Sequence, residues 1–527
     1  MVMHHVVKKP NRPLPHGTAN AYVYKSSIFV EKKPDVKMSW LNRFTIRFVY
    51  IGNPGSHNSD FRKQHEDGFA FTVLHYIKQH FKVLKDILMK LLASLCSMLL
   101  VAISPGSCWA DDNWSQWRGP LNSGVSESAE PPVTWSETEN IKWKAAIDGN
   151  GTSTPIIWGD KVFLLTAIKT EEKDSSIPDP KDQPKTNFFD IKRPNAVHEF
   201  VVICLNKKTG KEIWRDIATK KIPHEGAHND NDFASASPTT DGKHLFCWFG
   251  SAGLFCYDLN GNKLWERNLG EVKVGSSLGE GSSPVLYGDK LVIVRDYNHK
   301  GSIEVLEAAS GKTVWRKERD ENNAWATPLV LEHSGRTQVI TSATNFVRSY
   351  DLESGDVIWQ CSGLTGNVTP CPVVEGDVVY CMSGYQGYSL LALPLTESGD
   401  ISQSDKIVWS RDRGTPYVPS PLLYDGMLYY TQSNNAILSC LDSKTGDTLL
   451  ERTRLPGLSN VYASPVGAAG RIYITDRNGT TLVLKRSNEL EVLATNKLDD
   501  TIDASPALAE DTLFLRGRKF LYCIQQQ

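Results

Sequence analysis

The sequence predicts an all-β fold: an eight-bladed β-propeller with four-stranded antiparallel blades over residues 135–527. Three observations lead to this prediction. A unit marked by proline recurs eight times, each unit contains up to four short strand-like runs, and the two ends of the repeat region carry complementary fragments of one unit. A period of about 40–50 residues with four strands is typical of propeller blades.

A small or hydroxyl-bearing residue close before a proline marks the start of each unit. The eight marked prolines are Pro155, Pro238, Pro284, Pro328, Pro372, Pro421, Pro465 and Pro506. After a first step of 83 residues, they are 41–49 residues apart. Proline has no N–H, so it is tolerated at the start of a strand. A Gly-Asp or Asp-Gly turn follows in most units, which favours a tight hairpin.

The chain begins the repeat with the end of a unit and finishes it with the beginning of one. "NIKWKAAI" (140–147) is a fourth strand with no unit before it, and the last unit, from Asp503, contains only the first three strands. We expect these two fragments to pair and form the eighth blade, which closes the ring and leaves no free radial edge.

Two units carry insertions. Residues 169–199 are charged and rich in proline, and we expect a long surface loop there. A smaller insertion at 394–406 lies in the fifth unit.

One large apolar residue per blade falls in the fourth strand and predicts a ring of wedges between neighbouring sheets. These residues are Trp143, Trp214, Trp265, Trp315, Trp359, Trp409, Leu450 and Leu493. A buried aromatic removes roughly 150–250 Å² from water. Because the spacing follows the blade rather than a pocket, we prefer packing to ligand binding as their role.

The cysteines predict core packing rather than a metal site. Cys204, Cys256, Cys440 and Cys523 occupy the same third-strand position in four units, too far apart to form disulfides. Cys371 and Cys381 flank one hairpin, and they either form a disulfide in an oxidising compartment or remain buried thiols. The sequence contains no CxxC motif.

The segment 89–110 is predicted to be a secretory signal peptide. Lys90 precedes an apolar run, Pro105 and Gly106 break it, and Ala110 stands where cleavage is expected. Residues 1–88 are then a mistakenly assigned or disordered extension, or the cytoplasmic tail of an uncleaved anchor. Residues 111–134 form the N-terminal segment of the mature chain. A lipid anchor at Cys108 is a weaker alternative, because Pro105 stands where such signals usually carry leucine.

Composition narrows the classes of partner. The formal net charge is -2, which gives no electrostatic signature for nucleic acid. No apolar run reaches the ~18–20 residues of a membrane-spanning helix. We expect a monomer that is exported to the periplasm or cell envelope.

The recurring pattern "LN-x-x-TG-x-x-x-W" resembles the pyrroloquinoline quinone (PQQ)-like β-propeller repeat over about residues 135–527. The opening "WSQWRGP" (114–120) resembles secreted propeller proteins. One branch of this family, the quinoprotein alcohol dehydrogenases, holds PQQ and Ca²⁺ over the channel between adjacent cysteines and a tryptophan. This sequence has no Cys-Cys pair. Another branch, the scaffold lipoprotein of outer-membrane β-barrel assembly, works through protein contacts without a cofactor.

The most polar loop, 223–238, is the first candidate for a ligand site at the channel mouth. It contains His224, Glu225, His228, Asp230 and Asp232. The hairpin at 294–301 adds Arg295, Asp296 and His299. The competing interpretation is that Asn and Asp side chains cap turns in solvated loops. No catalytic residue and no metal-binding motif can be assigned.

The resemblance implies a non-catalytic binding or scaffold protein of the envelope, whose partner is a protein or another envelope component. The alternative is a PQQ-dependent oxidoreductase using PQQ and calcium. A hydrolase or lyase at the channel mouth has no constellation of residues behind it.

Overall fold

A computed structural model describes residues 113–185, 188–403 and 405–527, together with two short strands before them. Those strands, β1 (Ile28–Phe29) and β2 (Arg47–Phe48), pair antiparallel with each other. The predicted signal peptide at 89–110 lies outside the described residues, as does the rest of the 1–88 stretch.

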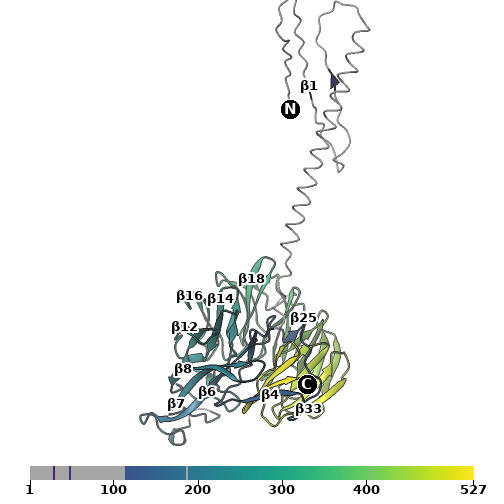
Figure 1. Cartoon of the computed structure of the whole chain (residues 1–527). Helices are drawn as coiled ribbons and strands as arrows, with labels where there is room; N and C mark the ends of the chain where they lie inside the picture. The colour runs from purple at the N-terminus through teal and green to yellow at the C-terminus, as the bar shows by residue number, and fades with distance from the viewer. Residues whose placement is uncertain (1–27, 30–46, 49–112, 186–187, 404) are drawn as a thin grey trace, which may run out of the picture. The chain divides into compact units, whose positions relative to one another are not determined.

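Residues 113–527 form an all-β propeller of eight sheets (Figure 1). Blade 1 comprises β5 (Ile156–Trp158), β6 (Lys161–Lys173), β7 (Ala196–Asn206) and β8 (Glu212–Lys221), and blade 2 comprises β9 (Thr239–Thr240), β10 (His244–Trp248), β11 (Leu254–Asp258) and β12 (Lys263–Arg267). Blade 3 comprises β13 (Val285–Tyr287), β14 (Lys290–Arg295), β15 (Gly301–Glu307) and β16 (Thr313–Arg319), and blade 4 comprises β17 (Leu329–His333), β18 (Arg336–Ser342), β19 (Val347–Asp351) and β20 (Val357–Cys361).

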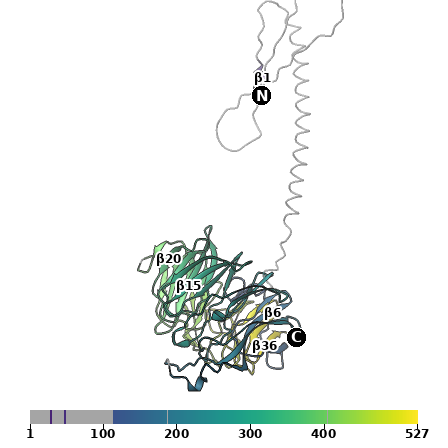
Figure 2. The ribbon, with the colours of Figure 1, turned by 90° about the vertical axis from the view of Figure 1, so that its left-hand side faces the viewer.

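The last four blades follow the same antiparallel order. Blade 5 comprises β21 (Val373–Glu375), β22 (Val378–Ser383), β23 (Ser389–Pro394) and β25 (Trp409–Arg411), and blade 6 comprises β26 (Leu422–Tyr424), β27 (Met427–Thr431), β28 (Ile437–Asp442) and β29 (Thr448–Arg454). Blade 7 comprises β30 (Val466–Ala468), β31 (Arg471–Thr475), β32 (Thr480–Lys485) and β33 (Val492–Lys497), and blade 8 comprises β34 (Ala507–Ala509), β35 (Thr512–Arg516), β36 (Phe520–Gln525) and β4 (Ile141–Ala146). In Figure 2, β15 and β20 lie on one side of the ring, and β6 and β36 on the other.

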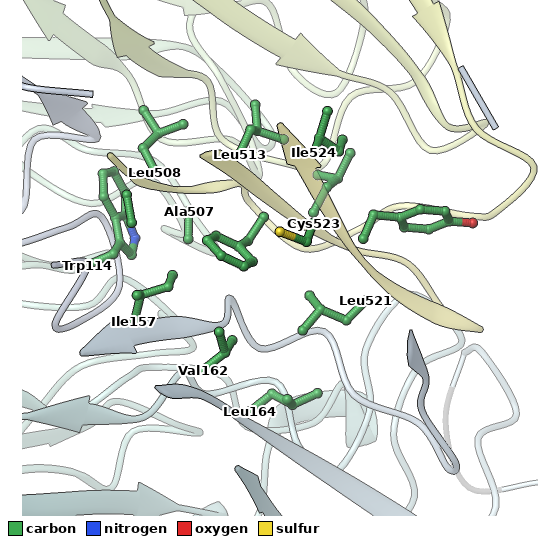
Figure 3. Packing of buried hydrophobic residues seen from close by; sticks show 14 of the residues in the cluster. Trp114, Ile157, Val162, Leu164, Ala507, Leu508, Leu513, Leu521, Cys523 and Ile524 are labelled. Carbon is green, nitrogen blue, oxygen red and sulfur yellow. The ribbon is translucent and has the colours of Figure 1, made fainter. Parts of the chain in front are cut away.

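The predicted closure of the ring is confirmed. β4 pairs antiparallel with β36, with Trp143 opposite Cys523, so the eighth blade combines strands from both ends of the propeller (Figure 1). A core shared by blades 1, 7 and 8 holds this junction together. Figure 3 shows Trp114, Ile157 and Ala507 close together in it, and all three are buried.

Burial differs between the strands of a blade because inner and outer strands have different neighbours. The second and third strands, such as β14 and β15, are buried on both faces. The fourth strands, such as β4, alternate between partly buried and exposed residues, which is the pattern of a sheet edge with one packed face.

The fourth-strand tryptophans connect neighbouring blades. In five of them, Nε1 donates to a carbonyl of the next blade: Trp143 to Lys207, Trp214 to Leu259, Trp265 to Ala308, Trp315 to Leu352 and Trp409 to Ser443. Each ring also lies on a turn glycine of that blade. At Gly446 (φ +73°), a Cβ would come within 3 Å of Trp409.

Three positions depart from that pattern. Trp359 is fully buried opposite Gly399, and its Nε1 has no hydrogen-bond partner in the described part of the chain. Leu450 sits opposite Cys440, as predicted. The prediction for blade 7 is one residue out of register: Ala494 lies opposite Val483, at the position that a tryptophan takes in other blades, and Leu493 falls on the exposed bulge beside it.

The insertions are more structured than predicted. β6 extends to Lys173 and β7 starts at Ala196, so the described loop is limited to residues 174–185 and 188–195 and contains the short 3₁₀ helix η1 (Pro180–Asp182). Two more such turns are η2 (Gly250–Ala252) and η3 (Gly275–Ser277). The second insertion contributes β24 (Gly399–Asp400), which pairs parallel with β20 and adds a fifth strand to blade 4.

The cysteines of the propeller are buried free thiols, so the suggested disulfide between Cys371 and Cys381 is wrong. Val373 pairs with Tyr380, which puts Cys381 opposite Pro372 rather than Cys371. Cys371 Sγ instead accepts a hydrogen bond from the Thr327 N–H. The four equivalent cysteines are core residues, as predicted: Cys204, Cys256, Cys440 and Cys523.

Candidate functional site: an axial pocket with one closed end

A cavity of about 670 Å³ lies on the propeller axis. Its wall is formed by the residues that precede the first strand of successive blades, among them Ser283, Thr327, Ser420 and Ser464. The hydroxyl–proline marker of the sequence therefore belongs to the residues around the axis.

A ring of hydrogen bonds around the axis explains why that marker carries a hydroxyl. The N–H of the residue before each proline donates to the side chain of the equivalent residue in the next blade, at 2.9–3.1 Å. The donor–acceptor pairs are Thr154–Ser237, Ser237–Ser283, Ser283–Thr327, Thr327–Cys371, Cys371–Ser420, Ser420–Ser464 and Ser464–Ser505. Between the last blade and the first, Thr154 Oγ1 donates to the Ser505 carbonyl at 3.1 Å.

One end of the cavity is closed by residues 113–126, which we call the floor segment. Trp114 exchanges two backbone hydrogen bonds with Ile157 of blade 1, and the Ser115 carbonyl accepts from Thr240 of blade 2. At its far end, β3 (Val125–Ser126) pairs parallel with β30 of blade 7. The segment therefore connects blades on different sides of the ring.

Arg118 anchors the floor segment to the backbone of the blades around it. Its Nη1 donates to the Pro465 carbonyl at 2.7 Å, and its Nη2 donates to the Pro421 carbonyl at 2.6 Å and the Ser123 carbonyl at 2.8 Å. The side chain is buried, and burial lowers the pKa of its guanidinium to about 10. The neighbouring Trp117 lines the cavity and packs against the core of blades 4 and 5.

At the open end, the loop between blades 1 and 2 is tied to blades 7 and 8 by a charged network. Asp230 accepts from Arg477 Nη1 at 2.6 Å and from the Tyr462 hydroxyl at 3.0 Å. Arg477 also pairs with Asp503 at 2.6 Å, and Asp503 in turn pairs with Arg518 at 2.8 Å. The carboxylates at this mouth are thus engaged by cations within the chain.

This network sets the protonation of its members. Burial alone would raise the pKa of Asp230, but the hydrogen bonds from Arg477 and Tyr462 outweigh it, so the pKa is lowered from the ordinary value of 3.8. Burial and the Asp230 charge together raise the pKa of Tyr462 to about 12. Asp230 is therefore a carboxylate and Tyr462 a phenol at neutral pH.

The residues of the predicted polar loop divide between two places. Of its five charged or His residues, His228 and Asp230 line the axial cavity. His224 and Glu225 line a separate hollow of about 60 Å³ formed by blades 1 and 2 and the loops that follow them. There His224 Nε2 is 2.6 Å from the Val272 carbonyl, and Glu225 Oε1 accepts from the Val274 N–H at 3.0 Å.

The remaining candidates serve the backbone and other side chains. Asp232 lines the smaller hollow and accepts from the Ala234 N–H at 2.7 Å. Arg295 donates to the Leu269 and Gly270 carbonyls, and Asp296 forms a buried two-point ion pair with Arg319 at 2.7 and 2.9 Å. His299 is exposed in a turn with φ +59°. The eight candidates therefore do not form one site.

Sequence reasoning missed most of the polar and aromatic residues of the cavity. Asn322 and Trp325 lie in "ENNAW", directly before the "ATP" marker of blade 4, and Asn367 of blade 5 matches Asn323 of the same stretch. Tyr385 and Tyr417 also line the wall, with ring centroids 4.9 Å apart. The available signal was a position just before a marker, which applies to all of these residues except Tyr385, which follows β22.

The cavity does not match the cofactor chemistry of quinoproteins. PQQ carries three carboxylates, which call for cationic partners, but none of the described residues that line the cavity is a lysine or an arginine. Within the described ranges, no group of three or more His, Cys, Asp or Glu residues is placed to hold a metal ion. These residues do not fit a PQQ–calcium pair.

The geometry defines a closed eight-bladed propeller with a pocket on its axis, and comparison with known proteins gives its class. The family model described as "Outer membrane protein assembly factor BamB" matches residues 198–452. The protein of that name from Yersinia pestis is 26% identical over 343 residues, which cover 60% of this chain and 78% of that protein. This chain is a PQQ-like β-propeller.

Solved structures agree with the fold. BamB from Moraxella catarrhalis matches with a TM-score of 0.50 at 14% identity, over 73% of this chain and 97% of that one. Quinohemoprotein alcohol dehydrogenase from Comamonas testosteroni matches with a TM-score of 0.55 at 9% identity, over 80% and 82% of the two chains. At such identities, these likenesses concern the fold alone. Among the described residues, no helix is long and apolar enough to cross a bilayer.

Proposed function

We propose that this chain is an exported, non-catalytic β-propeller that binds another component of the cell envelope through its open face. The similarity to proteins named outer membrane protein assembly factor BamB supports an envelope role. The predicted signal peptide at 89–110 supports export, with the mature chain starting near Asp111. Mass spectrometry of the mature protein tests that start directly.

The observation that carries the proposal is the chemistry of the open face. Its carboxylates Asp230 and Asp503 are held by Arg477 and Arg518 in a network that joins three blades. Groups fixed in this way are poor candidates for general acid–base work, which needs a group free to exchange a proton with a substrate. Such a network does hold loops rigid for recognition.

Exposed aromatic side chains lie beside that network. Phe189 lines the cavity, is 47% exposed, and packs edge-on against His228 with ring centroids 5.1 Å apart. Phe188 next to it is 84% exposed. Large exposed aromatics are enriched at protein contact surfaces and rare elsewhere on a soluble surface.

Co-purification from detergent-solubilised envelopes of the source organism tests the proposal. The tagged wild-type chain should retain a reproducible envelope protein, identified by mass spectrometry. Replacing Phe188 and Phe189 with serine should reduce its recovery severalfold, about the effect expected for losing aromatic anchors of an interface.

The matched control replaces Ile213 and Leu264 with serine. These residues are 45% and 49% exposed, but they lie on the outer strands β8 and β12. If both variants reduced recovery of the envelope protein equally, the open face would not be the binding surface. Dye reduction with alcohols after addition of PQQ and Ca²⁺ would replace the proposal with the oxidoreductase alternative.

A further inference from the structure

We propose that the axial pocket binds a neutral, polyhydroxylated ligand, namely a short oligosaccharide. This inference goes beyond the proposed function and is independent of it, because it concerns the inside of the channel rather than the contact with an envelope partner. Four properties of the pocket support it: its size, its polar groups, its aromatic groups and its charge.

The pocket has the volume and closure of a ligand site. About 670 Å³ lies within the roughly 300–1,000 Å³ common for small-molecule pockets. Trp117 of the floor segment closes one end, so the cavity is a blind pocket rather than a tunnel.

The polar groups of the wall suit hydroxyl groups. Asn322, Asn367 and Gln386 each carry an amide that can both donate and accept. A sugar hydroxyl also donates and accepts, so amides can match it at many angles, whereas a charged group satisfies only one of the two roles.

The aromatic groups offer flat apolar surfaces for the C–H faces of a sugar ring. Tyr385 and Tyr417 are stacked on one side of the wall, and Trp325 is fixed by its Nε1, which donates to the Gly279 carbonyl at 2.7 Å. The π face of such a ring carries partial negative charge and attracts the slightly positive C–H groups.

The charge balance disfavours ionic ligands. The acids that line the pocket, Asp230 and Asp503, share Arg477 within the chain. An anionic ligand would meet two carboxylates and no wall cation of the described residues, and burying an unpaired charge is costly.

A peptide strand would find few free backbone N–H groups at the ring of hydrogen bonds around the axis. Around the axis, the N–H of the residue before each marker proline donates to the next blade, from Thr154 through Ser464. The prolines that follow have no N–H. Strand addition depends on such free backbone groups, so a saccharide fits the wall better than a peptide.

Titration calorimetry and tryptophan fluorescence of the folded full-length propeller test the proposal. The probes are cellotriose, maltotriose and chitotriose, with trigalacturonate, PQQ and triglycine as comparators. We expect at least one neutral trisaccharide to bind saturably with a Kd of about 1 mM or tighter, and the comparators to bind at least about tenfold more weakly. No binding by any neutral trisaccharide, or tighter binding of a comparator, overturns the proposal.

Four variants locate the binding. Tyr417→Ala and Asn322→Ala should each weaken the trisaccharide about fivefold or more, since each removes a wall contact, whereas Ile213→Ala on β8 should leave the affinity unchanged. Tyr417→Phe keeps the ring and serves if Tyr417→Ala does not fold, and it should weaken binding less. Unchanged affinity in folded Asn322→Ala, and in Tyr417→Ala where it folds, would place the ligand elsewhere and contradict the proposal. Loss of trisaccharide binding with intact partner recovery would separate this inference from the proposed function.

Discussion

Arg118 at the floor of the channel and Arg477 at its mouth serve different kinds of partner. Arg118 is buried and donates to three backbone carbonyls, whereas Arg477 is shared between the carboxylates of Asp230 and Asp503 and remains partly exposed. Backbone acceptors at the floor have no substitute donor if the guanidinium is lost. At the mouth, the two carboxylates can be solvated by water if the guanidinium of Arg477 is lost. The difference suggests that the floor mainly stabilises the ring, while the mouth orders the loops used for recognition.

The largest effect is expected from Arg118→Ala. It leaves the Pro465 and Pro421 carbonyls without their charged donor, and hydrogen bonds to charged groups are worth about 1.5–3 kcal/mol. We expect a loss of about 3 kcal/mol in the free energy of unfolding, measured by urea denaturation. Arg118→Lys keeps the charge but not the forked geometry, and should recover only part of it. A loss below about 1 kcal/mol for Arg118→Ala would mean that the floor segment does not stabilise the ring.

The second-largest effect is expected from Gly124→Ala, which tests the close packing of the floor segment on Arg118. The φ of Gly124 is +78°, and a Cβ there would lie 2.5 Å from the Arg118 guanidinium carbon. Gly124→Ala should therefore destabilise the protein by about 2 kcal/mol, through both backbone strain and displacement of Arg118. The matched control is Gly470→Ala, at φ +69° with nothing within 4 Å, which carries the strain alone. Equal losses in the two variants would contradict the close packing on Arg118.

At the mouth, Asp230→Asn should cost about 1 kcal/mol at pH 7, because the pair with Arg477 is partly solvated. The folded protein lowers the pKa of Asp230, so its contribution is fully present above the unfolded value of 3.8 and is lost as pH falls through the folded pKa. The stability difference between wild type and variant should be constant from pH 7 to about 5 and shrink below 3.8. A difference that grows on acidification would refute the assignment.

The smallest effect is expected from Arg518→Ala, because this side chain is 44% exposed. Its pair with Asp503 should contribute about 0.5 kcal/mol at low ionic strength and less at 1 M salt, where exposed charges are screened. Thermal melts at the two salt concentrations measure it. A salt-independent loss above about 1 kcal/mol would show that the mouth resembles the floor more than proposed.

Local periodicity was enough to predict the blades and their closure. Residues 140–147 resemble the fourth strand of the other units, which indicated that they pair with the incomplete last unit. In the structure, β4 completes the eighth blade in this way. The wedge prediction failed at Leu493 because the wedge position of blade 7 holds the small Ala494. Choosing the one large apolar residue of the strand selected its neighbour, which falls on the bulge that blades 1 to 4 also carry.

The site was harder to predict because its parts are far apart in sequence. Arg118 binds a carbonyl 347 residues away, and Asp230 binds a side chain 247 residues away. Local composition pointed to the loop 223–238, but it could not separate Asp230, which reaches the axial cavity, from Glu225, which lines another hollow. Only the ring places Tyr385 and Tyr417 beside that loop's cavity.

Site-specific photocrosslinking in the envelope tests the division between floor and mouth most directly. A benzophenone side chain at Phe188, which is 84% exposed at the open face, should crosslink an envelope component. The same group at Leu121, which is 59% exposed in the floor segment, should give no such product. Crosslinks from Leu121 with none from Phe188 would contradict the claim that recognition occurs at the mouth.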